Sequence, residues 1–89
     1  MMNIMQLNKQ FIDGVRQCDY KIGTRFLVHE PIYDFSGFLI KVGTKLSIDT
    51  LGWEYTWIRD TFGHRNYKFD HEDFNSLVRR KKLTKLGDA

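Results

Sequence analysis

The chain has 89 residues, too few for two independent hydrophobic cores, so we expect a single globular domain. Its composition, 42% hydrophobic and 15% aromatic, is typical of a folded protein and excludes intrinsic disorder. The net charge of +3 would by itself favour an anionic partner, but the basic residues are not spread evenly along the chain. Residues 79–85 carry five basic side chains, whereas residues 1–78 carry nine basic and ten acidic ones. We therefore predict a nearly neutral domain at 1–78 and a basic C-terminal tail at 79–89.

Residues 3–17 have the apolar spacing of an amphipathic helix. Ile4, Leu7, Phe11 and Val15 recur every three or four positions, so that they share one face. A helix this short is not stable alone, because isolated helices of this length are marginal in water. We expect it to cover the outside of a small sheet.

An eight-residue segment occurs twice. KIGTRFLV at 21–28 returns as KVGTKLSI at 41–48. In both copies a glycine, which adopts turn conformations that other residues resist, comes before a strand that starts with a β-branched threonine. Two copies are too few for a repeat architecture, so we interpret the segment as a common way of entering a strand.

The remaining pattern predicts about five strands and a second helix. The segment DHEDFNSLVRR at 70–80 predicts a short helix, because its acidic residues come first and its arginines last, as the helix dipole favours. The expected fold class is α+β, with a small, strongly curved antiparallel sheet or barrel, an N-terminal amphipathic helix and a short C-terminal helix. The strands are expected at 24–30, 37–41, 44–50, 53–59 and 65–70.

Trp53, Tyr55 and Trp57 alternate along one predicted strand and therefore lie on one face of it. If residues 51–52 form a two-residue hairpin turn, the rings share that face with the apolar residues of the preceding strand. We favour packing in the core, because aromatic residues in a sheet more often pack than bind. The alternative is an exposed platform beside Lys68 that stacks bases or holds an apolar anchor of a partner.

Three segments resemble parts of an SH3 domain. PIYDFSGFLIKVGTKLSI at 31–48 looks like the stretch from the first strand to the diverging turn. YTWIRDTFGHRNYKF at 55–69 takes the place of the distal hairpin, and DHEDF at 70–74 that of the last helical turn. The resemblance covers residues 24–74 and implies an SH3-like small barrel. The proline of the last turn and the acidic cluster at 31–37 are missing, so binding of proline-rich ligands is not implied.

The sequence contains no catalytic or metal-binding pattern. His29, His64 and His71 have none of the spacings typical of zinc sites, and no glycine-rich phosphate loop occurs. Pairing of Cys18 with a histidine would need contact across the fold, and free cysteines usually behave as small hydrophobes. We expect no enzyme activity, no cofactor, no metal and no catalytic residues.

The expected compartment is the cytoplasm, and we expect no membrane contact. Cys18 is the only cysteine, so no intramolecular disulfide can form, which is compatible with reducing surroundings. The first ten residues lack the pattern of a signal peptide, and the longest apolar run, at 38–40, is far too short to cross a membrane.

Two functions from different classes fit the sequence. The leading hypothesis is a non-enzymatic protein-binding module that acts on a larger complex through exposed aromatic side chains, namely Tyr33, Phe35, Trp53, Tyr55 and Trp57. A short, aromatic-rich chain is also similar in general look to bacteriophage accessory proteins, which implies an inhibitor or adaptor acting on a host complex. The alternative is a DNA- or RNA-binding domain whose phosphate contacts are Lys68, Arg79, Arg80, Lys81, Lys82 and Lys85. A homodimer is compatible with both hypotheses.

Overall fold

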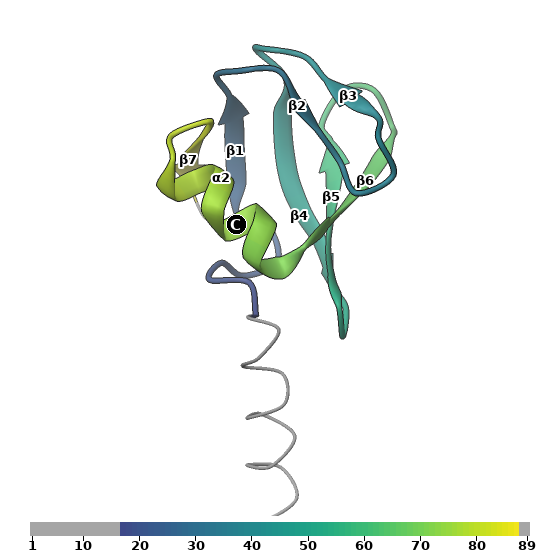
Figure 1. Cartoon of the computed structure of the whole chain (residues 1–89). Helices are drawn as coiled ribbons and strands as arrows, with labels where there is room; N and C mark the ends of the chain where they lie inside the picture. The colour runs from purple at the N-terminus through teal and green to yellow at the C-terminus, as the bar shows by residue number, and fades with distance from the viewer. Residues whose placement is uncertain (1–16, 88–89) are drawn as a thin grey trace, which may run out of the picture.

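The computed structural model describes residues 17–87, so the predicted helix at 3–17 lies outside the described residues except for its last position. Within these residues, seven strands and one helix follow in chain order (Figure 1). They are β1 (Arg25–Val28), β2 (Ile32–Tyr33), β3 (Leu39–Ile40), β4 (Lys45–Leu51), β5 (Tyr55–Asp60), β6 (Asn66–Asp70), α2 (His71–Arg79) and β7 (Leu83–Gly87).

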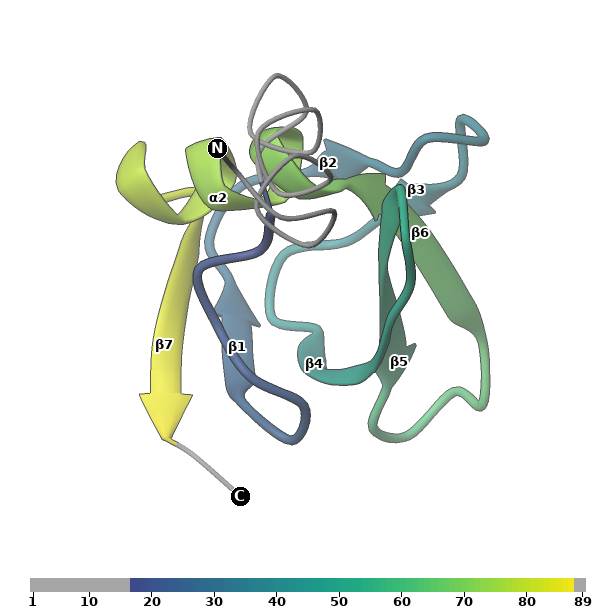
Figure 2. The same ribbon diagram turned by 90° about the horizontal axis from the view of Figure 1, so that it is seen from below.

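The fold is mostly sheet. Five strands form one antiparallel sheet in the order β6-β5-β4-β1-β7, and β2 pairs with β3 in a separate two-stranded sheet. Strands make up 44% and helix 13% of the described residues, so the predicted α+β class is wrong. Within residues 17–87, β6 and β7 are the two edges of the sheet and do not pair with each other, so the expected small barrel is an open, curved sheet. Figure 2 shows this curve, with α2 and β2 across its open side.

The inner, concave face of the sheet carries the core. Phe74 of α2 is fully buried and meets Phe26 of β1 edge-to-face, with ring centroids 5.1 Å apart. It also packs on Phe69 of β6 at 5.8 Å. The helix therefore seals the core through one aromatic side chain, whose burial contributes about 1.5–3 kcal/mol. Buried residues of the strands complete the core, namely Phe26, Val28, Ile32, Ile40, Leu46, Ile48, Ile58, Tyr67, Phe69 and Leu83.

The repeated segments pair with each other at the centre of the sheet. Gly23 and Gly43 have φ angles of 90° and 88°. The threonine after each glycine donates its N–H to the lysine carbonyl two residues before that glycine, at 3.1 and 3.2 Å. Gly23 N–H donates to the Ile48 carbonyl and Gly43 N–H to the Val28 carbonyl, both at 2.8 Å. Each glycine thus ties its turn to the end of the other copy's strand, so the repetition builds the β1–β4 pair.

The connection between β4 and β5 is not a two-residue turn. Ile48 pairs with Ile58 in the core, and the register then shifts by one residue in β4. Tyr55 and Trp57 consequently point away from the core, and Trp57 is 36% exposed. Trp53 lies in the turn and is 68% exposed. The favoured prediction, that these rings pack in the core, is therefore wrong, because a β-bulge and a longer turn reverse the face.

The basic segment is not an appended tail. Arg79 ends α2, and β7 then pairs with β1 from Leu83 opposite Val28 to Gly87 opposite Arg25. Leu83 is 1% exposed and belongs to the core. The predicted boundary at 78/79 therefore cuts through the folded unit. This strand was not predicted because it has only one buried residue, Leu83, and follows a run of charged residues.

Candidate functional site

Four side chains form a cluster on the outer, convex face, which we call the aromatic platform: Phe35, Tyr55, Trp57 and Lys68. The ring centroids of Phe35 and Tyr55 are 5.0 Å apart, and those of Tyr55 and Trp57 are 6.4 Å apart. Lys68 Nζ lies 4.7 Å from the Tyr55 centroid, 5.3 Å from that of Phe35 and 5.8 Å from that of Trp57. Each such cation–π contact contributes about 0.5–1 kcal/mol at an exposed site. The lysine therefore places a positive charge at the centre of an apolar surface.

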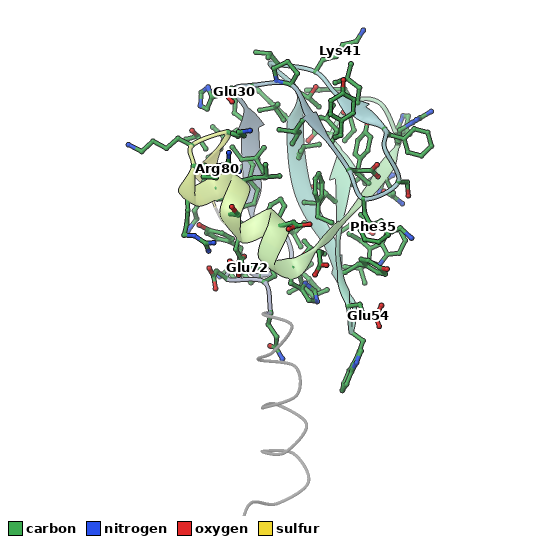
Figure 3. The ribbon with its side chains drawn as sticks, viewed as in Figure 1. Glu30, Phe35, Lys41, Glu54, Glu72 and Arg80 are labelled. Carbon is green, nitrogen blue, oxygen red and sulfur yellow. The ribbon has the colours of Figure 1, made fainter. Side chains whose placement is uncertain are left out.

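Asp34 brings Phe35 to this face. Its buried carboxylate accepts N–H bonds from Ser36 at 3.0 Å and Phe38 at 2.8 Å, which folds the loop between β2 and β3. The same carboxylate accepts the Lys68 N–H at 3.3 Å, and Phe35 N–H donates to the Lys68 carbonyl at 2.8 Å. The loop is thereby fixed along the edge of β6, and Figure 3 shows Phe35 on the β5–β6 side of the molecule.

A row of residues crosses the outer face beside the platform. One residue from each strand of the five-stranded sheet lies in this row. In the order β6, β5, β4, β1 and β7, they are Asn66, Arg59, Ser47, Arg25 and Gly87. The two arginines are exposed and stand two strand spacings apart, about 10 Å. We call Arg25 and Arg59 the arginine row. Among residues 17–87, neither arginine forms an ion pair, so both guanidinium groups are available to an anion.

Glycine at position 87 leaves room for one of these guanidinium groups. A Cβ built on Gly87 would stand 3.1 Å from Nη2 of Arg25, so the guanidinium lies directly over the edge strand. The outer face therefore presents charge as far as β7.

Four cations lie on the outer face among the described residues, and three of them lie at the end of the sheet where the arginine row crosses it. The acids lie away from the arginine row: Asp49 is in the bulge of β4, Glu54 comes just before β5, and Asp70 lies opposite Tyr55 of the platform. The Asp60 carboxylate is engaged in its own turn, where it accepts N–H bonds from residues 62 and 63 at 3.0 Å. Residues 1–78 are nearly neutral in total, but four of their basic side chains lie together on the outer face. Its cations are Arg25, Lys45, Arg59 and Lys68.

The predicted nucleic-acid residues are split by the fold, because only Lys68 lies in the platform. Arg79 forms an ion pair with Glu72 on α2, and Lys82 lies 3.9 Å from Glu30. Arg80 follows α2 and lines the same hollow as Tyr33 and Phe35. The others follow in the turn and in β7, namely Lys81 and Lys85. Arg80 therefore borders Phe35 of the platform, whereas the other four lie on α2, in the turn and on β7.

The predicted protein-binding residues are also divided. Phe35, Tyr55 and Trp57 come together in the platform. Tyr33, 66% exposed, lines a hollow of about 240 Å³ between the β2–β3 loop and α2. Trp53 lines a second hollow of about 240 Å³ at the opposite end of β5 from the arginine row. The arginine row was not predicted from the sequence. The one sequence feature that points to it is that each arginine alternates with residues expected to be buried in its strand.

The hollow beside Trp53 contains a thiol and an imidazole but no catalytic arrangement. His71, 2% exposed, donates from Nε2 to the Gly52 carbonyl at 2.9 Å. Its Nδ1 therefore accepts the Thr56 hydroxyl at 2.7 Å, since a carbonyl can only accept. Burial raises the pKa of the Cys18 thiol, which keeps it protonated and weakly nucleophilic. His71 thus joins α2 to the β4–β5 turn as a structural residue. Among the described residues, no group of histidine, cysteine or acidic side chains could hold a metal ion.

Comparison with known proteins yields no match to a family model, to a curated protein or to a solved structure. The resemblances to SH3 domains and to bacteriophage accessory proteins therefore stay predictions. In the part of the chain that the structure describes, no helix is long and apolar enough to cross a membrane.

Proposed function

We propose that the protein is a non-enzymatic nucleic-acid-binding module that uses the outer face of its sheet. The observation that carries this proposal is the placement of the arginine row beside the aromatic platform on one face. Guanidinium groups bind phosphate through paired N–H donors, and aromatic rings stack on bases without sequence preference. Charge complementarity with the four cations favours a polyanion as the occupant of this face.

Because of where the charges lie, we now prefer nucleic-acid binding to protein binding, the leading hypothesis from the sequence. A nearly neutral domain with a basic tail argues against DNA or RNA, because nucleic-acid-binding domains usually present one basic face. Here the outer face is basic although the domain is not, and two of the tail cations are already paired with glutamates. The proposed phosphate contacts are therefore Arg25, Lys45, Arg59 and Lys68.

The proposal is tested by titrating the full chain into a fluorescein-labelled DNA 20-mer, single-stranded and duplex, at 50 and 200 mM NaCl. Four phosphate contacts to a single strand predict a loss of affinity of about 50-fold across this salt range. Arg25→Gln with Arg59→Gln is expected to weaken binding. Lys81→Gln with Lys82→Gln removes the same charge in the turn before β7 and is the matched control. Absence of binding to both DNA forms, or equal losses in both double variants, would reject the proposal.

A protein partner is the second candidate, and a different surface favours it. Phe62 is 75% exposed and Val42 is 57% exposed, at the tips of neighbouring turns that share a broad hollow. Lys41 and Lys45 line the same hollow, so the fitting partner is an apolar segment with acidic flanks. This surface suits the inhibitor or adaptor role expected from the sequence. Its test is a pull-down in which a partner held by the wild type is lost from Val42→Ser with Phe62→Ser and kept by Trp57→Ala.

A further inference from the structure

We infer that the outer face selects single-stranded nucleic acid, with phosphates on the arginine row and bases on the aromatic platform. This inference rests on the proposed function and adds the form of the polyanion. Its basis is the curvature of the sheet together with the spacing between charges and rings.

The outer face is convex. α2 lies on the concave side of the sheet (Figure 2). The core residues of the strands are buried on that side, so the residues that alternate with them lie on the outside of the curve. The arginine row spans β5, β4 and β1 and therefore follows this curve. A DNA duplex is straight over this length, since its persistence length is about 50 nm, and a straight rod touches a convex surface along a narrow strip. A flexible single strand can follow the curve and reach both arginines.

The spacing of charges and rings matches a strand laid across the sheet. Arg59 and Trp57 are two residues apart on β5, which places them about 7 Å apart on the same face. Thr50, Trp57 and Lys68 form the next row across β4, β5 and β6, parallel to the arginine row. A backbone on the arginine row can therefore turn its bases toward Trp57. In a duplex the same bases are stacked and paired, and no ring can reach their faces.

Lys68 couples the two parts of this surface. Its ammonium lies over the three ring faces, where it has no anionic partner among residues 17–87. A phosphate that takes up this ammonium draws it off the rings, which frees them to stack. Lys68→Met keeps the length and apolar character of the side chain and removes the charge. This variant is therefore expected to weaken binding and to flatten its salt dependence by about one phosphate contact.

The test uses the full chain and fluorescein-labelled oligo-dT of 12 nucleotides, alone and as a blunt dT–dA duplex, at one salt concentration. Binding of the single strand is expected to be at least about tenfold tighter, with quenching of tryptophan fluorescence. Trp57→Ala is expected to weaken single-strand binding about 5- to 100-fold and to leave duplex binding unchanged. Trp57→Phe, which keeps a ring, is expected to retain most of the affinity.

Trp53→Ala is the matched control, because Trp53 is an exposed indole outside the platform. Equal affinity for duplex and single strand would overturn this inference and leave the proposed function standing. Binding of neither form would overturn both. Single-strand binding that Trp57→Ala leaves intact, or that Trp53→Ala reduces to the same extent, would also overturn the inference. Circular dichroism spectra that match the wild type establish that each variant is folded.

Discussion

Phe26 of β1 lies directly opposite Leu46 of β4, and each is the sixth residue of its copy of the repeated segment. The flanking pairs exchange places across this point, since Arg25 pairs with Ser47 and Leu27 with Lys45. A local twofold axis therefore passes between Phe26 and Leu46. It also relates the fifth residues of the copies, Arg25 and Lys45, which both carry positive charge on the outer face.

The two repeat glycines are expected to be equally sensitive to substitution. A Cβ at Gly43 would have nothing within 4 Å, so the cost of Gly43→Ala comes from its φ of 88° alone. We expect Gly43→Ala and Gly23→Ala each to lower the free energy of unfolding by about 1–2 kcal/mol in urea titrations. Ser36→Ala, at an exposed loop position, is the control and is expected to stay within about 0.5 kcal/mol. A neutral Gly43→Ala would contradict the strained-turn explanation.

Truncation of an aromatic residue is expected to cost more stability on the inner side of the sheet than on the outer side. Phe26 is 0% exposed, so Phe26→Ala opens a cavity and costs about 3–5 kcal/mol. Trp57 lies on the outer face, so Trp57→Ala is expected to cost no more than about 1–2 kcal/mol, mainly through lost ring and Lys68 contacts. Thermal unfolding of both variants compares these costs. A larger loss from Trp57→Ala would place this indole in the core.

The hydroxyl group of Thr56 is expected to contribute more to the free energy of unfolding than the size of this side chain does. Thr56→Val keeps the shape of the side chain but leaves Nδ1 of the buried His71 without its donor. The expected loss is about 1–3 kcal/mol in urea unfolding. Thr84→Val on β7, an exposed position, makes the same chemical change and is expected to be nearly neutral. Equal effects of both substitutions would argue against the His71 hydrogen bond.

The protein is expected to lose stability at alkaline pH. Burial raises the pKa of the Tyr67 phenol, and the Asp60 carboxylate raises it further. Burial likewise raises the pKa of the Cys18 thiol. Both groups hold their protons more tightly in the folded chain, so their contribution is complete below the unfolded-state pKa values and is lost as pH rises past them. Those values are 9.0 for the thiol and 10.0 for the phenol.

Urea unfolding between pH 7 and 11 measures this loss. Cys18→Ala is expected to remove the part that begins near the thiol pKa, and Tyr67→Phe the part that begins near the phenol pKa. Tyr33→Phe is the control, because this tyrosine is 66% exposed. If Tyr67→Phe leaves the alkaline profile unchanged, the buried phenol is not responsible.

Local sequence patterns predicted most of the strands and the helix at 71–79, because alternation of buried residues and the charges at helix ends act over a few residues. They also revealed the repeated segment, although the pairing of its two copies through β1 and β4 was not predicted. The aromatic platform depended on register instead. A single extra residue in β4, at Asp49, turns Trp57 outward, and neither composition nor spacing reveals such a bulge.

The arginine row lay beyond sequence reasoning for a second reason. Arg25 and Arg59 are far apart in the chain and become neighbours only through the strand order β5-β4-β1. Their outward positions are visible in RFLV and WIRD, where each arginine alternates with buried residues. The sequence does not reveal that β1 and β5 lie on either side of β4 with both arginines opposite the same residue, Ser47.

The loop fixed by Asp34 has one more consequence. The Lys68 N–H and carbonyl both bond to this loop, so β6 offers a blocked edge there, whereas β7 has no second strand neighbour within residues 17–87. Growth of a filament by stacking sheets side to side requires two open edges on every copy. The five-stranded sheet of residues 17–87 thus has one open edge, at β7, and pairing of two copies through β7 would leave no such edge for a third.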